Sequence, residues 1–132
     1  MNYNTTRKGI IGQEIVKLYL LKLNAKVFEP VCDDFGIDLL VDTKNGYKTI
    51  QVKYHNFKQA KSISSIQVFV KNTKADWIAT PFILNEETYI IWFKNDLNRK
   101  EQWGKSFSIT TPINNQSKKI NFYWNYLKSP VE

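Results

Sequence analysis

The stretch FGIDLLVDTKNGYKTIQVKY, residues 35–54, predicts a β-hairpin. Alternating apolar positions place one strand at residues 37–42 and the other at residues 47–54, with Asn45-Gly46 between them. Asn-Gly suits a type I′ turn, because both central residues of that turn need a positive φ angle. The turn therefore predicts where along their length the two strands pair.

Counting back from this turn brings three polar residues to one face of the hairpin. A two-residue loop places Lys44 opposite Tyr47. The same register then places Asp38 opposite Lys53, and Gln51 shares their face because side chains two apart on a strand project to the same side. The predicted patch holds a carboxylate, an amide and an ammonium group, although a bulge or an odd-length loop would change this register.

The composition indicates one folded, basic domain. A chain of 132 residues, 42% of them apolar and 14% aromatic, can bury a core without disulfides or metal ions. Nineteen Lys and Arg against twelve Asp and Glu give a net charge of +7 and a pI near 9.4. This charge favours a polyanionic partner, nucleic acid before membrane, with a purely solubilising role as the alternative.

Export and membrane insertion are not predicted. The N-terminal residues MNYNTTRKG lack the apolar core of a signal peptide, and no apolar run reaches membrane-spanning length. Cys32 is the single cysteine, which excludes a disulfide or a Cys-based zinc site within one chain. We expect a soluble, cytoplasmic protein without membrane contact.

A helix is predicted from Thr5 or Thr6, either of which could cap it, to about Leu23, with Asn24 as a left-handed C-cap. Its predicted apolar face consists of Ile11, Ile15, Leu18 and Leu21 or Lys22. Glu14 lies on or beside this stripe, where a carboxylate needs a partner or a metal ion. The alternative is a Glu14 that pairs with Lys17 or reaches solvent.

Three further stretches carry strand patterns. Residues 25–31 predict a short strand, and Pro30 places it at a sheet edge or at the end of the strand. The apolar runs at residues 75–82 and 88–93 predict a second hairpin. Residues 106–113 could form a short strand, and we expect the tail after Ser129 to be loose.

Residues 63–71 fit two patterns. Ile63, Ile66 and Val70 have helical spacing, while Ile66, Val68 and Val70 alternate as in a strand. We predict a helix here, because a crossover is needed between the first hairpin and the strands that follow it.

In residue order and spacing the chain resembles the PD-(D/E)XK nuclease superfamily, which includes Holliday junction resolvases, restriction enzymes and intron-encoded homing endonucleases. Gly12-Gln13-Glu14 matches the helical motif with an auxiliary acid. Gly36-Ile37-Asp38 matches the invariant acidic position, without the proline that names the family. Gln51-Val52-Lys53 matches the (D/E)XK element, with glutamine where an acid is usual. The resemblance covers about residues 8–93.

The resemblance implies an α/β fold with a restriction-endonuclease-like core. That core has a helix, a three-stranded antiparallel meander, a second helix and a further strand. We expect residues 1–132 to form a single nuclease-like domain, with the core at about 8–93 and a basic, aromatic C-terminal extension at about 94–128.

The function implied by the resemblance is metal-dependent hydrolysis of DNA by Glu14, Asp38, Gln51 and Lys53. Phosphodiester hydrolysis needs a hard cation, and Asp38, Gln51 and Glu14 would bind Mg²⁺, with Mn²⁺ able to substitute. Lys53 would orient the attacking water or stabilise developing negative charge. Because the amide of Gln51 brings no charge, a catalytically silent DNA-binding module of the same fold is the alternative.

DNA is the expected partner, and a domain that binds only proteins is a third possibility. The expected DNA contacts are Lys58, Lys61, Lys118, Lys119, Tyr54 and His55. For each group, a solvated loop beside core aromatics is the alternative. One chain offers one site, so cutting both strands would need a homodimer or a homotetramer. Small size and a basic C-terminal part are most like a homing endonuclease or a junction resolvase.

Overall fold

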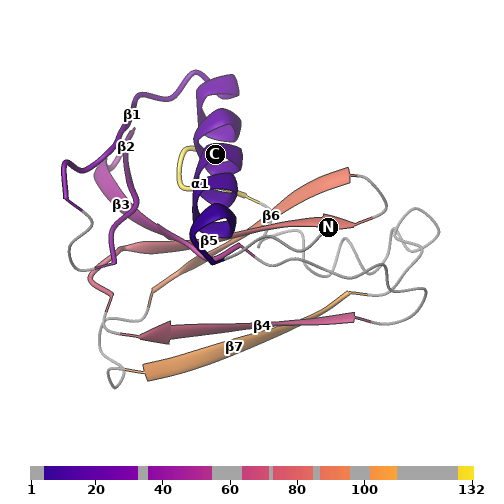
Figure 1. Ribbon diagram of the computed structural model, residues 1–132. Helices are drawn as coiled ribbons and strands as arrows, with labels where there is room; N and C mark the ends of the chain where they lie inside the picture. The colour runs from indigo at the N-terminus through magenta and orange to yellow at the C-terminus, as the bar shows by residue number, and fades with distance from the viewer. Residues whose placement is uncertain are drawn as a thin grey trace.

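The computed structural model describes residues 5–32, 36–54, 64–71, 73–84, 87–95, 102–109 and 128–132. Within these residues the chain forms one helix and seven strands (Figure 1). They are α1 (Thr5–Lys22), β1 (Val27–Phe28), β2 (Leu39–Thr43), β3 (Gly46–Val52), β4 (Ser64–Lys71), β5 (Trp77–Leu84), β6 (Glu87–Lys94) and β7 (Gln102–Ile109). Within the described residues, no helix combines the length and the apolar character needed to cross a bilayer.

Five strands form one mixed sheet in the order β1-β2-β3-β5-β6. The first three are an antiparallel meander, β5 runs parallel to β3, and β6 returns antiparallel to β5. The predicted helix, meander, further strand and second hairpin are therefore confirmed, as is the edge position of the first strand. β4 and β7 form a separate two-stranded antiparallel sheet.

The helix contacts the sheet through a different face from the predicted one. Its buried positions are Gly12, Val16 and Leu20, whereas Leu18 is 53% exposed. Of the predicted stripe, Ile15 packs partly against the core, but the centre of the buried face was wrong, because glycine carries no apolar signal although its small size lets α1 approach β3 closely. The core between α1 and the sheet consists of Val16 and Leu20 from the helix, together with Leu39, Val41, Ile50, Ala79, Ile90 and Trp92 from the strands. Asn24 has a φ of 63°, which confirms the left-handed C-cap.

Gly12→Ala is expected to destabilise the protein by about 1–2 kcal/mol. A Cβ at Gly12 would lie 2.8 Å from the Cβ of Tyr54 and 3.3 Å from Cγ1 of Val52, and overpacking of this kind outweighs the helix propensity that alanine gains. Gly9→Ala is the matched control, because a Cβ there meets nothing within 4 Å. Urea unfolding of both variants checks this, and a Gly12→Ala variant as stable as Gly9→Ala would contradict it.

The register of the first hairpin differs from the predicted one by two residues. Thr43 pairs with Gly46 rather than Lys44 with Tyr47, so the loop residues are Lys44 and Asn45. Gly46 has a φ of 95°, but Asn45 does not have the positive φ that a type I′ turn requires. The hydroxyl of Thr43 explains the difference, since it accepts from the amide of Asn45 at 3.1 Å and donates to the carbonyl of Gly46 at 2.6 Å.

Residues 64–71 form strand β4, so the helix predicted at 63–71 was wrong. The whole length of β4 pairs with β7, from Ser64–Ile109 to Lys71–Gln102. The sequence of this segment fits both a helical and a strand pattern, and pairing with the distant strand β7 selects the strand. The short strand expected at 106–113 is part of β7, which begins and ends earlier in the chain.

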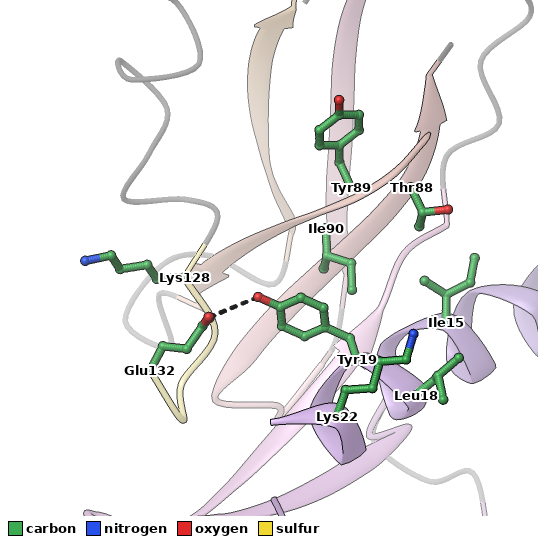
Figure 2. A pocket seen from close by; sticks show the side chains of 9 residues that line it. All are labelled: Ile15, Leu18, Tyr19, Lys22, Thr88, Tyr89, Ile90, Lys128 and Glu132. Carbon is green, nitrogen blue, oxygen red and sulfur yellow. Dashed lines mark hydrogen bonds between the residues drawn. The ribbon is translucent and has the colours of Figure 1, made fainter. Parts of the chain in front are cut away.

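The last five residues are fixed against α1, contrary to the expected loose tail. Oε1 of Glu132 accepts a hydrogen bond from the Tyr19 hydroxyl at 3.1 Å, and Oε2 accepts from the amide of Ser129 at 2.6 Å (Figure 2). Burial and the Glu132 carboxylate raise the pKa of Tyr19 to about 12. Ile15 and Leu18, which were predicted to face the core, line the groove beside this contact (Figure 2).

Candidate active site

Asp38 closes the open end of the first hairpin. The β2–β3 ladder ends at the pair Leu39–Ile50, and Asp38 lies one residue beyond it. Its amide donates to the carbonyl of Ile50 at 2.8 Å, and its Oδ2 accepts from the amide of Val52 at 2.7 Å. The carboxylate of Asp38 thus accepts a hydrogen bond from β3, as a backbone carbonyl of the neighbouring strand would do if the ladder continued. Asp38 is half-buried and held at a fixed place on β3.

Gln51 presents a buried oxygen without a partner. Ile50 faces the core, so Gln51 lies on the opposite face of β3. Within the described residues its Oε1 is buried and accepts no hydrogen bond. Gly36, with a φ of 68°, leaves room for this amide, because a Cβ at Gly36 would lie 3.0 Å from Nε2 of Gln51 and 2.9 Å from Oγ1 of Thr73. An unpaired buried acceptor costs about 1–3 kcal/mol, which a bound ligand would recover.

Lys53 follows β3 directly and is half-buried. Its amide donates to the carbonyl of Ala79 in β5 at 2.8 Å, which fixes the backbone on the side away from β2. Alternation places Lys53 on the face of Gln51, and Asp38 on the face opposite the buried Leu39. The structure thus brings the carboxylate, amide and ammonium residues to one end of the hairpin.

Glu14 is not brought to this cluster. It lies two residues from both Gly12 and Val16, about 200° around the helix from the buried face. Its side chain is 58% exposed, and its Oε1 lies 2.8 Å from Nζ of Lys17. Lys17 also binds Glu29 at 2.9 Å, and these hydrogen bonds raise the pKa of Lys17 above its usual value.

The α1 side chain that hydrogen-bonds to Asp38 is that of Gln13. Its Nε2 donates to the backbone carbonyl of Asp38 at 3.2 Å in partly buried surroundings. Sequence reasoning missed Gln13 because an amide gives a weaker signal for metal chemistry than the acid next to it. The available signal was its position beside Gly12, where the helix approaches the sheet most closely.

Of the expected DNA contacts, only Tyr54 lies within the described residues. It is half-buried, and its Cβ packs close to Gly12 on the face of the sheet that α1 covers. His55, Lys58, Lys61, Lys118 and Lys119 lie outside the described residues.

A family model described as PD-(D/E)XK endonuclease matches residues 3–98. The chain belongs to the PD-(D/E)XK endonuclease family. Its fold is similar to a solved structure of a bacterial homing endonuclease, I-Ssp6803I, with a TM-score of 0.58 and 16% sequence identity. The match covers 93% of this chain and 92% of that one. Comparison with curated proteins gives no match.

Membership of the PD-(D/E)XK family confirms the resemblance found in the sequence, and with it the restriction-endonuclease-like fold. The protein is accordingly a nuclease by family. Its two strand motifs, residues 36–38 and 51–53, meet at the end of the hairpin where the carboxylate and the unpaired amide oxygen lie.

PD-(D/E)XK nucleases typically use divalent metal ions, and the oxygen donors at this site suit a hard cation. Asp38 supplies a carboxylate, and Gln51 supplies a buried oxygen that lacks a protein donor. In the described part of the chain, no three His, Cys, Asp or Glu residues gather into a metal-binding group. These two donors suit a hard divalent cation that takes only a few of its ligands from the protein.

Proposed function

We propose that this PD-(D/E)XK nuclease is a Mg²⁺-dependent DNA endonuclease with Asp38, Gln51 and Lys53 as its catalytic groups. The observation that carries the proposal is the buried Oε1 of Gln51, which has no hydrogen-bond partner among the described residues, at the same hairpin end as the fixed carboxylate of Asp38. A buried acceptor without a partner is unfavourable unless it serves a ligand. Glu14 receives no catalytic role, because it is exposed and paired with Lys17.

The three residues would divide the work on the scissile phosphate. Asp38 and Gln51 would hold the cation, and Gln13 would keep the backbone of Asp38 in place through its 3.2 Å hydrogen bond. A bound Mg²⁺ would polarise a phosphoryl oxygen and lower the pKa of a coordinated water. The ammonium of Lys53 would stabilise the negative charge that develops on the phosphate. Since only one of the metal-binding side chains is charged, substrate phosphate oxygens would complete the ligand set.

Several features support DNA as the substrate and a homing-type enzyme as the kind of nuclease. The net charge of +7 suits a polyanion, and the fold is similar to a homing endonuclease over nearly the whole chain. A junction resolvase is the second type that the family allows. His55, Lys58, Lys61, Lys118 and Lys119 remain proposed DNA contacts. Cutting both strands would require a homodimer or a homotetramer, because each chain offers one site.

The decisive test is DNA cleavage by the wild type in Mg²⁺, Mn²⁺ or EDTA. The substrates are a supercoiled plasmid library with random inserts, which contains rare target sites, and a synthetic four-way junction. We expect cutting in either metal and none in EDTA, with the library preferred by a homing-type enzyme and the junction by a resolvase. Cutting in EDTA would contradict the metal requirement. DNA binding without cutting in either metal would favour the silent DNA-binding module, which the uncharged Gln51 supports.

A further inference from the structure

In the two-stranded sheet formed by β4 and β7, the described side chains of β4 alternate between buried and exposed positions. This sheet is an antiparallel ribbon of eight residue pairs outside the five-stranded sheet, and Figure 1 shows its strands side by side, away from α1. Val68 and Val70 are 4% and 2% exposed, whereas Phe69 between them is 72% exposed and Lys71 is also exposed. Over residues 68–71, one face of β4 is therefore buried and the other is open to solvent.

The register and the sequence give the residue types at the positions that share a face with Phe69 and Lys71. Positions two apart on a strand, and the positions paired with them, share a face. The pairs that share the face of Phe69 and Lys71 are Ser65–Ser108, Gln67–Ser106, Phe69–Gly104 and Lys71–Gln102. Apart from Phe69 and Gly104, each of these residues is polar, and neither strand contains an acidic residue.

We propose that this face of the β4–β7 ribbon, called the ribbon face below, enters the major groove of duplex DNA. The proposal rests on the proposed function, because it names the surface by which the endonuclease recognises its substrate. A two-stranded antiparallel ribbon has the width that the major groove admits. Hydroxyl and amide groups can donate to and accept from base edges, and lysines contact phosphates or guanine. A protein partner would call for an apolar centre larger than one aromatic residue.

Phe69 gives the ribbon face a means to distinguish bases. It pairs with Gly104, which has no side chain to cover the ring from the neighbouring strand. An aromatic ring exposed in this way gains by contact with the methyl group of thymine, which projects into the major groove. Phe69 is thus a specificity residue, and Lys71 is a contact to phosphate or guanine.

The end of the ribbon adjoins the active site. Thr73 lies two residues after Lys71, so their Cα atoms are within about 7 Å. The hydroxyl of Thr73 donates to the carbonyl of Gly36 at 3.0 Å, and Gly36 lies against the amide of Gln51. DNA seated on the ribbon face would therefore run past the residues that hold the scissile phosphate.

The test uses the cleavage-inactive Asp38→Asn protein, so that binding is measured without cutting. Duplexes are selected from a random-sequence pool, and Phe69→Ala and Lys71→Ala are then added singly. We expect each substitution to raise Kd for the selected duplex roughly tenfold, and Lys71→Ala also to remove protection of guanine N7 from dimethyl sulfate. Lys71→Ala should also reduce the slope of log Kd against log salt by about 1.

Tyr47→Ala and Lys44→Ala are matched controls, since Tyr47 on β3 is 62% exposed and Lys44 is exposed in the loop between β2 and β3. Both controls should bind like the parent. Unchanged Kd and unchanged guanine protection in the ribbon variants would overturn the inference, as would the absence of duplex binding at low salt. If the wild type cuts no DNA but the ribbon variants lose binding, the proposed function fails and the ribbon inference stands. If the wild type cuts DNA but the ribbon variants bind normally, the ribbon inference fails and the proposed function stands.

Discussion

Asp38→Asn is expected to slow DNA cleavage about a thousandfold while leaving the protein folded. Asparagine keeps an oxygen that can accept from the amide of Val52, so the end of the hairpin stays closed. It removes the negative charge on which the affinity for Mg²⁺ and the stabilisation of the transition state depend. Initial rates of plasmid nicking give the effect on activity, and thermal unfolding reports on the fold.

Asp42→Asn is the control for this variant, because Asp42 is a half-buried aspartate on β2, the strand that Asp38 immediately precedes. It should cut at a rate close to that of the wild type. A folded Asp38→Asn protein that keeps its cleavage rate would show that Asp38 serves only to close the hairpin. Equal losses of cleavage rate in both aspartate variants would mean that cleavage depends on negative charge in this part of the hairpin in general, rather than on the carboxylate of Asp38.

Lys53→Met is expected to lower the cleavage rate about a hundredfold with little change in DNA binding. Methionine keeps an unbranched, flexible chain but removes the ammonium group that would stabilise charge on the phosphate. The backbone bond from Lys53 to Ala79 does not involve the side chain, so the strand should remain in place. Single-turnover rates at saturating enzyme separate this loss in the chemical step from a loss of binding.

Lys48→Met controls for the removal of a positive charge from the same strand, since Lys48 lies on the opposite face of β3. Partial recovery in Lys53→Arg would support a role in charge stabilisation. A loss in Lys53→Met that appears only as a higher Kd for DNA would assign Lys53 to binding and contradict a role in the chemical step.

Much of the hairpin core could be predicted because its strands follow local rules. Apolar alternation predicts strands at residues 37–42 and 47–54, and the structure confirms both with shifted ends, at residues 39–43 and 46–52. The register could not be predicted from Asn-Gly alone, since the hydroxyl of Thr43 bonds to the turn backbone and selects another loop. A shift by two residues keeps every side chain on its face, so Asp38 and Gln51 still meet.

The other errors come from long-range contacts. Residues 64–71 alternate like a strand and repeat like a helix, and only pairing with β7 decides between the two. The buried helix face depends on Gly12, whose small size matters only once β3 lies against it. That rotation turns Glu14 to solvent and brings Gln13 to Asp38 instead. Whether Asp38, Gln51 and Lys53 catalyse cleavage stays a prediction.

The hydrogen bond from the amide of Val52 to Asp38 has a consequence for how this sequence would evolve. Replacement of Asp38 by a residue without a side-chain acceptor would leave that partly buried amide unpaired and weaken the fold as well as any activity. A lineage that stopped cutting DNA would therefore still tend to retain Asp38 or to replace it only with asparagine. The side-chain oxygen of Gln51 has no comparable partner among the described residues, so drift would change Gln51 first. Among descendants of this protein, an unchanged residue 51 would be the better marker of a working enzyme.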